Sequence, residues 1–255
     1  MSGESYSVNT IVLRKTPLGE GDLIITLLAE DGSQLRCVAK GARKPTSAFS
    51  ARLELYSVAE VHCVRGRSLD IVKEARLIDS NARVRVDLER SSCAAPIAEL
   101  LDAVSHEGLS DPRLFPMAKA VFAKMGDASA AQALSLSVAE LIKMLCVVGF
   151  RPSIDTCVHC GKPVDIAQAS QVRLSDIDGG VICDQCASFS ETRIVDANIL
   201  AWCKLFIGST FDEVVKLDVD PSVSFAVLEF VHQWTRVHVG KTLKSLNFLF
   251  TCGLF

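Results

Sequence analysis

Four cysteines, arranged in two pairs, are the residues of this sequence best suited to a defined chemistry. Cys157 and Cys160 form one Cys-x-x-Cys pair, and Cys183 and Cys186 form a second, with 22 residues between the two pairs. A Cys-x-x-Cys turn points both sulfurs at one spot, so two such turns can surround a single tetrahedral cation. The spacing predicts one structural Zn²⁺ per chain, because four sulfurs leave no coordination position for water or substrate.

The residues around these cysteines also favour a small metal-binding module. Gly161 directly follows the first pair, where a turn often needs a positive φ. Asp178-Gly179-Gly180 predicts the tip of a hairpin that returns the second pair to the first. We expect residues 151–190 to lose their fold without metal, because structural zinc contributes about 10–16 kcal/mol in small modules.

Other uses of paired thiols fit the sequence less well. A disulfide framework would need an oxidising compartment, and the first residues, Met-Ser-Gly-Glu, show no secretion signal. A redox-active pair would need a thioredoxin-like βαβ setting, which the pattern does not predict. His159 lies inside the first pair and offers an alternative ligand, although neutral packing beside the metal is the favoured interpretation. We therefore expect a cytoplasmic protein with reduced thiols.

No catalytic motif is apparent in the sequence. None of the five histidines lies in a Ser/His/Asp or His-Glu-x-x-His context, and no Walker or Gly-x-Gly-x-x-Gly motif occurs. The His-x-Glu partner of the zinc deaminases is also absent. We expect no enzymatic activity and no small-molecule substrate.

Length and composition indicate an ordinary globular protein. The chain has 255 residues, of which 49% are hydrophobic and 22% charged, enough for one large or two modest domains. The longest near-apolar run, residues 141–150, contains Lys143 and is far shorter than the ~20 residues of a membrane span. We expect no membrane association.

Charge is distributed unevenly along the chain. The net charge is −3, but residues 1–80 carry 11 lysines and arginines against 10 acids. Residues 35–53 contain five cations and no acid: Arg36, Lys40, Arg43, Lys44 and Arg52. If all five contacted phosphates of a single strand, log K would fall with log salt with a slope of about −3.5.

The first eighty residues have the pattern of a small β-barrel. Runs rich in Val, Ile and Leu, separated by turn residues, occur at 10–14, 22–28, 34–40, 55–64 and 69–78. Five short strands with tight turns predict a closed barrel, and an OB-fold is the natural candidate. Such barrels bind single strands through cations and aromatic platforms.

The segment 40–49 is expected to be a loop that presents charge. Gly41 and Pro45 interrupt strand structure and leave Lys40, Arg43 and Lys44 on the loop. Phe49 and Tyr56 are close enough in sequence to supply stacking rings, but a solvated loop with Phe49 in the core explains the pattern equally well.

Helical periodicity begins near residue 82. Helices are predicted around 97–104, from the Asp111-Pro112 cap to Met125, over 134–148, from a cap at Thr192 or Asp196 to Phe206, and from Pro221 to Gly240. The predicted fold class is α+β, with a barrel domain at 1–80 and a helical domain at 81–255 into which the zinc module is inserted.

Several stretches resemble one family over most of the chain. They are Ile-Val-Leu-Arg at 11–14, Pro-Leu-Gly-Glu at 17–20, Val-Ala-Lys-Gly-Ala-Arg-Lys-Pro at 38–45, Gly-Phe-Arg-Pro at 149–152 and the Arg…Gly-Lys…Leu-Lys-Ser-Leu run at 236–246. Together with the cysteine pairs, they resemble the RecO family of bacterial DNA repair proteins. The departure is Leu174-Ser175, where family members often carry an aromatic residue before the Gly-Gly.

The resemblance implies a recombination mediator of the RecF pathway, cytoplasmic and associated with the nucleoid. Such a protein binds single- and double-stranded DNA, anneals complementary strands, and loads RecA together with RecR and the tail of single-strand-binding protein. It implies phosphate contacts by Arg14, Lys40, Arg43, Lys44 and Arg52, and zinc ligation by the four cysteines. The family varies in whether it keeps the cysteines. A protein-interaction scaffold with structural zinc and no direct DNA role, or a zinc enzyme, are the alternatives.

Overall fold

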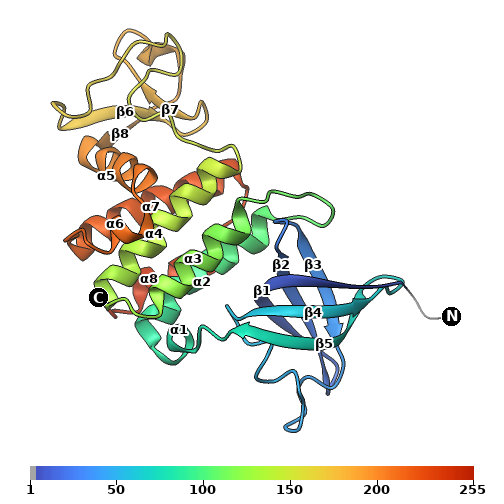
Figure 1. Cartoon of the computed structure of the whole chain (residues 1–255). Coiled ribbons are helices and arrows are strands. Elements are labelled where there is room, and N and C mark those ends of the chain that lie inside the picture. Colours follow the sequence, from blue (N-terminus) through green and yellow to red (C-terminus); the bar gives the residue numbers. More distant parts are fainter. Residues whose placement is uncertain (1–3) are drawn as a thin grey trace. The chain divides into compact units, whose positions relative to one another are not determined.

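The chain forms two compact units in the computed structural model, which describes residues 4–255 (Figure 1). The first, Met1–Ala128, contains five strands and three helices, and the second, Ser129–Phe255, contains the other helices and a small sheet. The predicted α+β fold, with an N-terminal barrel, a helical region and a four-cysteine module, is confirmed. The units divide after the third helix, whereas the sequence pattern changes near residue 80.

Five strands close into an OB-like barrel. They are β1 (Ser5–Leu18), β2 (Asp22–Ala29), β3 (Gln34–Ala39), β4 (Val58–Val64) and β5 (Asp70–Asp79). The order around the barrel is β1-β2-β3-β5-β4, with β4 pairing back onto β1. The β3–β5 pair is parallel and short, and the other pairs are antiparallel.

The length of β1 allows the barrel to close. Its first half pairs with β4, from Ser5 opposite Val64, and its second half pairs with β2, ending at Leu18 opposite Asp22. The register with β2 shifts between Val12 and Arg14. Such a bulge bends a strand and increases its twist, so one strand can serve two neighbours.

The barrel interior follows the period-two pattern of the strands. In β4, Ala59, Val61 and Cys63 are fully buried, whereas Glu60 and His62 between them are partly exposed. The interior cluster also takes in Leu53, which precedes β4.

Three helices complete the first unit: α1 (Ala82–Val86), α2 (Leu88–Val104) and α3 (Leu114–Met125). Helices α2 and α3 pack on β1, and α2 also contacts β2. The prediction that Pro112 begins α3 is wrong, because the helix starts two residues later. The Asp111 carboxylate accepts hydrogen bonds from the backbone N–H and the guanidinium of Arg113, which fixes a turn ahead of the helix.

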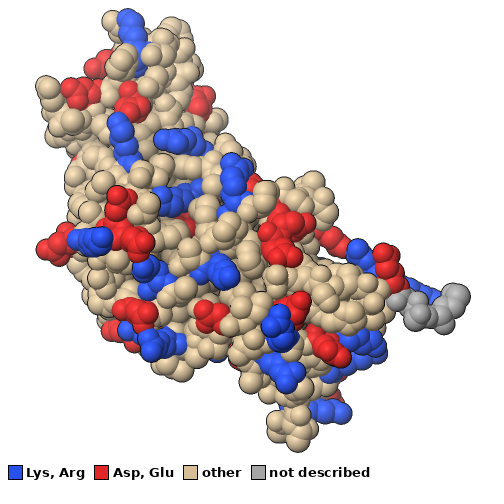
Figure 2. Space-filling view, viewed as in Figure 1, with Lys and Arg blue, Asp and Glu red and all other residues tan. Residues whose placement is uncertain are grey.

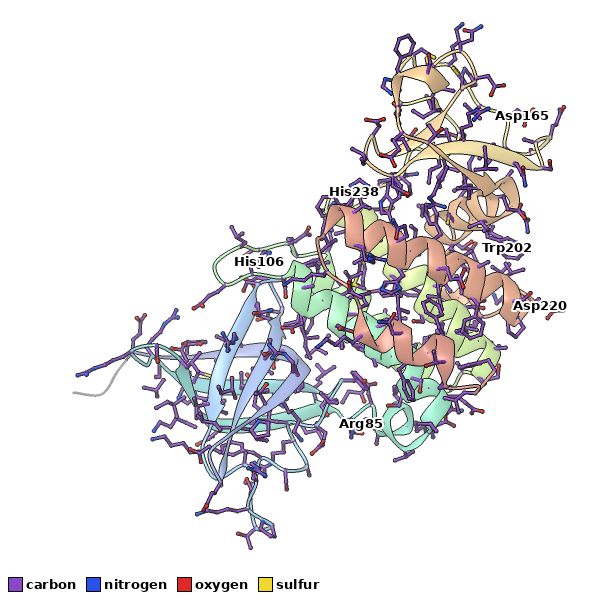
Figure 3. The ribbon with its side chains drawn as sticks, turned by 180° about the vertical axis from the view of Figure 1, so that it is seen from behind. Arg85, His106, Asp165, Trp202, Asp220 and His238 are labelled. Carbon is purple, nitrogen blue, oxygen red and sulfur yellow. The ribbon has the colours of Figure 1, made fainter. Side chains whose placement is uncertain are left out.

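Helix α4 is the centre of the second unit. It contacts three of the other helices of this unit, α5, α6 and α7. The helices are α4 (Ala130–Val147), α5 (Ala197–Gly208), α6 (Phe211–Val214), α7 (Pro221–His238) and α8 (Lys244–Thr251). Asp220 caps α7 through the N–H of Ser222, and Figure 3 shows Asp220 and His238 at opposite ends of this helix. The Trp234 indole donates to the Phe150 carbonyl, which holds the chain beyond α4 against α7.

By length and composition alone, α4 is apolar enough to cross a membrane. However, 67% of its 18 residues are buried inside the protein. A core helix surrounded by other helices has the same composition.

The four-cysteine module lies in the chain between α4 and α5. Strands β6 (Gln171–Ser175), β7 (Gly180–Ile182) and β8 (Arg193–Asp196) form an antiparallel sheet in the order β7-β6-β8. Ser175 lies opposite Gly180, as the hairpin prediction required. The α5 cap is Asp196, whose carboxylate accepts from the Asn198 N–H, and not the alternative Thr192.

Glu140 of α4 provides a test of how the second unit is packed. It is fully buried, and neither carboxylate oxygen has a hydrogen-bond partner among the described residues. Burial raises its pKa from 4.5 to about 8, despite the nearby Lys143. The native state therefore holds a proton that the unfolded chain releases above pH 4.5, so this residue destabilises the fold increasingly as pH rises toward 8.

We predict that Glu140→Met raises the free energy of unfolding by about 3 kcal/mol at pH 7, and by much less at pH 5. Urea unfolding of both proteins at pH 5, 7 and 8 measures the difference. A gain that does not change with pH would contradict the prediction.

Candidate functional site

Residues 40–52, which we call the basic loop, leave β3 and are anchored to the β1–β2 turn. The Gly41 N–H donates to Asp22 Oδ1 at 2.7 Å, and the Arg43 N–H donates to the Gly21 carbonyl at 3.0 Å. The Arg43 guanidinium also donates to the Gly19 carbonyl at 2.8 Å. Gly41 has φ +69°, a conformation that a residue with a Cβ adopts at a cost.

The cations of this loop are exposed and are not neutralised by acids. Lys40 and Lys44 form no ion pair among the described residues, and Arg43 uses carbonyl groups. The aliphatic stem of Lys44 runs beside Gly21 and Gly41, so its ammonium is held near the same turn. Three positive groups are thus presented together in positions where a phosphate backbone could contact them.

Arg52 lies at the far end of the basic loop. It donates to the Ala75 carbonyl of β5 at 3.2 Å and lines an open hollow of about 610 Å³ on β1, β4 and β5. Arg76 and His62 also line this hollow, but so do two glutamates. In the view of Figure 2, cationic and acidic side chains are interspersed over the barrel. Arg52 shares its hollow with Glu60 and Glu74.

Arg14 has a structural partner. Its guanidinium donates to both carboxylate oxygens of Asp102 in α2, at 2.9 and 3.5 Å. The Gln34 amide donates to the Asp102 carbonyl at 3.0 Å, so Asp102 ties β1, β3 and α2 together. Of the five expected phosphate contacts, Arg14 is thus the one already paired with an acid.

The sequence left open whether Phe49 and Tyr56 stack on bases or pack in the core. Tyr56 is 3% exposed and stacks on Phe122 of α3, with ring centroids 5.0 Å apart, so it packs in the core. Phe49 is half-buried against the barrel core. Tyr56 has φ +66°, a conformation that its sequence context gave no reason to expect.

Two arginines flank a glycine in the turn between β4 and β5, Arg65-Gly66-Arg67. This β4–β5 turn lies where OB-like barrels bind oligonucleotides. Arg65 lies over the Tyr6 ring, 4.7 Å from its centroid, and 3.5 Å from Asp70, whereas Arg67 is exposed. The two arginines around a glycine are the sequence feature that could have marked this turn as a candidate nucleic-acid contact.

The four cysteine sulfurs converge on one point in the second unit. The Sγ atoms of Cys157, Cys160, Cys183 and Cys186 all lie within 4.8 Å of one another. Cys160 Sγ and Cys183 Sγ are 3.6 Å apart, well beyond a disulfide bond and close to the ~3.8 Å edge of a tetrahedron with 2.3 Å zinc–sulfur bonds. The set could bind a metal ion with a filled shell.

Two tight turns build this cluster. The Gly161 N–H donates to the Cys157 carbonyl, with Gly161 at the predicted positive φ of +71°, and the Cys186 N–H donates to the Cys183 carbonyl. The Val158 N–H donates to the Val181 carbonyl and joins the first turn to β7.

The thiol electrostatics favour a bound cation. Burial raises the pKa of Cys157, but N–H groups of Cys183, Cys160 and His159 donate to its sulfur and lower the pKa to about 6. Burial and the neighbouring sulfurs instead raise the pKa of Cys186 to about 12. Four adjacent thiols cannot all ionise without a positive charge among them.

The His159 imidazole makes contacts away from the sulfurs. Its Nε2 contacts Ser190 Oγ and lies 3.4 Å from Asp178 Oδ2, so it joins the hairpin turn to the segment after the second pair. The favoured interpretation, packing beside the metal, fits this geometry.

Comparisons with known proteins agree with both units. The family model described as recombination protein O, N terminal, matches residues 1–81, and the C-terminal model of the same protein matches residues 85–247. The chain is 31% identical to the DNA repair protein RecO of Bifidobacterium longum, over 96% of this chain and 98% of the relative. Identity is 31% with the RecO of Desulfitobacterium hafniense (94% and 87% covered) and 33% with that of a Roseiflexus species (98% and 86%).

We predict that the purified protein binds one divalent metal ion and that Cys160→Ser weakens this binding. Metal removal should abolish the slow amide exchange of residues 151–190, because a structural metal supplies most of the folding free energy of such a module. Hydrogen exchange and metal analysis measure both effects. Cys252→Ser, outside the cluster, is the control and should leave them unchanged; retained protection after metal loss would contradict the prediction.

Proposed function

This chain belongs to the RecO family of DNA repair proteins, and from that premise we propose that it acts as a non-catalytic, DNA-binding recombination mediator. In this proposal, it binds single- and double-stranded DNA, anneals complementary strands and promotes RecA loading. Its proposed partners are RecR and the tail of single-strand-binding protein, and its proposed location is the bacterial cytoplasm.

The observation that carries the DNA-binding proposal is the anchored cluster of Lys40, Arg43 and Lys44. These cations are exposed, lie on one loop of an OB-like barrel, and have no acidic partner among the described residues. Ammonium and guanidinium groups bind phosphate oxygens whatever the base sequence. A mediator that anneals any complementary pair of strands needs this kind of sequence-independent binding.

We propose that Arg52 and Arg14 contribute unequally to phosphate binding. Arg52 is exposed and, among the residues that the structure describes, bonds only to the Ala75 carbonyl, so its charge remains available. Arg14 must share its guanidinium between Asp102 and any phosphate. We propose that the strand follows the basic loop from Lys40 to Arg52 and that Arg14 contributes mainly by holding α2 on the barrel.

For the four thiols we propose zinc as the metal and a structural role. The sulfurs of Cys157, Cys160, Cys183 and Cys186 would fill a tetrahedral shell. The ion would fix the module, and the DNA contacts proposed above lie in the other compact unit.

We predict that the triple variant Lys40→Glu, Arg43→Glu, Lys44→Glu binds single-stranded DNA on the order of 100-fold more weakly than the parent at low salt and loses annealing activity. The magnitude of the salt slope should fall, from about −2.8 to about −0.7, because three of the four phosphate contacts proposed along the loop disappear. Fluorescence anisotropy with an oligo-dT across a salt series measures both.

The matched control is Lys119→Glu, Lys216→Glu, Lys241→Glu, which changes the net charge equally at exposed sites outside the loop. It should keep the parent salt slope. Equal losses in the two variants would show that net charge, and not the loop, governs binding.

A separate prediction distinguishes Arg14 from the loop. Arg14→Gln should lower the free energy of unfolding by about 1 kcal/mol, because it leaves the Asp102 carboxylate without its main partner. Lys40→Gln should leave stability unchanged and weaken DNA binding more. Urea unfolding measures the stability of both variants, and fluorescence anisotropy measures their DNA affinity. If Lys40→Gln lost more stability and Arg14→Gln lost more DNA affinity, the proposed roles of the two residues would be refuted.

A further inference from the structure

The four sulfurs of the cysteine cluster differ in their access to solvent. Cys157 is 1% exposed and Cys183 and Cys186 are partly buried, whereas Cys160 is exposed. The Cys183 N–H donates to Cys157 Sγ at 3.4 Å, so a hydrogen bond also shields the buried sulfur. The susceptibility of a cysteine to oxidation follows its thiolate character and its exposure. Among these four, Cys160 is therefore the sulfur that a reagent in solution reaches first.

Metal binding would keep this exposed sulfur in its reactive form. A thiol that coordinates a divalent cation has lost its proton, and the thiolate is the form that attacks an electrophile. With the proposed zinc bound, Cys160 is an exposed thiolate at neutral pH. Cys252, outside the cluster, differs in both respects, because it is partly buried and its S–H donates to the Leu249 carbonyl at 3.4 Å.

A second thiol lies close to Cys160 on the opposite turn. Cys183 Sγ is 3.6 Å from Cys160 Sγ, and a disulfide bond needs the two sulfurs to close to about 2.05 Å. The side chains of Lys162 and Gln185 also join the two turns, with Nζ donating to Oε1 at 2.8 Å. Cys157 is a poorer partner for Cys160, because it is buried and already accepts a hydrogen bond. The geometry favours a bond between the turns over one within a turn.

We propose that Cys160 is a modification site for hydroperoxides and that Cys183 converts the oxidised sulfur into a disulfide. A cysteine that oxidises beside a second thiol is trapped as a disulfide, which is reversible, before it reaches the irreversible acids. The inference rests on the metal proposed above and does not depend on the DNA contacts.

The reaction has two steps, each a displacement by sulfur. Cys160 Sγ attacks one oxygen of hydrogen peroxide, the O–O bond breaks, and the departing hydroxide takes a proton from solvent. Cys183 Sγ then attacks Cys160 Sγ, the S–O bond breaks, and a second hydroxide leaves and is protonated. Two thiolates, one peroxide and two protons thus give one disulfide and two waters. The sulfurs lose two electrons and the peroxide gains them.

The disulfide would exchange one cross-link for another. Only Cys157 and Cys186 would remain as thiolates, which is two ligands short of a tetrahedral shell. The new bond would still join the two turns, because it closes a loop with 22 residues between Cys160 and Cys183. Oxidation would therefore release the metal without separating the turns, and a thiol reductant with added zinc would reverse it.

The full chain, loaded with zinc and treated with a small excess of hydrogen peroxide beside a colorimetric zinc chelator, tests the proposal. We expect the release of one zinc ion per chain and the formation of the Cys160–Cys183 disulfide at the same rate. Alkylation of the remaining thiols, digestion without reductant and fragment mass spectra show which cysteines are linked. Cys252 is the internal control and should be recovered alkylated.

Two matched variants exchange a thiolate for an imidazole and keep four ligands: Cys160→His at the exposed position and Cys157→His at the buried one. Cys160→His should release zinc about tenfold more slowly than the parent, because the exposed thiolate is gone. Cys157→His should release zinc at the parent rate. Metal analysis first shows that each variant holds one zinc ion, and the disulfide map of the parent requires neither variant.

A disulfide within either Cys-x-x-Cys pair, or equal rates of zinc release from the two variants, would overturn the proposal. A parent that keeps its zinc and four unmodified cysteines in excess peroxide would overturn it too, but would leave the structural metal site intact. A parent that contains no zinc and takes up none would contradict the structural metal itself, so the two failures are distinguishable.

Discussion

The attachment of the basic loop to the β1–β2 turn is the constraint on which the proposed function depends. Asp22 accepts the Gly41 N–H, and Arg43 donates to the carbonyls of Gly19 and Gly21. Because these bonds use backbone groups and a single carboxylate, they fix the loop without neutralising Lys40 or Lys44. A flexible loop with the same residues would lose more conformational entropy on binding DNA.

The two chemically distinctive features have different tasks. The four sulfurs of the thiol cluster in the second unit could fill all four positions around a tetrahedral ion, an arrangement typical of structural metal sites. The basic loop in the first unit presents Lys40 and Lys44 without an acidic partner among the described residues. Together they fit the proposed function, in which the loop binds DNA and a metal maintains one part of the fold.

Local patterns in the sequence predicted the parts of the fold that local interactions decide. The five strands, the Gly161 turn and the Asp178–Gly180 hairpin depend on neighbouring residues, and all are confirmed. The short helices α6 and α8 were missed, because one or two turns give too little periodicity to recognise.

Long-range contacts could not be predicted from the sequence. Arg14 pairs with Asp102, 88 residues away, and nothing near either residue indicates the other. Tyr56 is buried because it stacks on Phe122 of α3. The family resemblance implied phosphate contacts for Arg14 and the loop cations alike, whereas the structure pairs Arg14 with Asp102 and leaves Lys40 and Lys44 without an acidic partner among the described residues.

The most direct measurement of the central claim is the acetylation of every lysine in the intact, metal-loaded protein, with and without oligo-dT, read by mass spectrometry. The account predicts that DNA protects Lys40 and Lys44, while Lys119, Lys216 and Lys241 react as before. Protection of the latter three, with Lys40 and Lys44 still reactive in the complex, would contradict it.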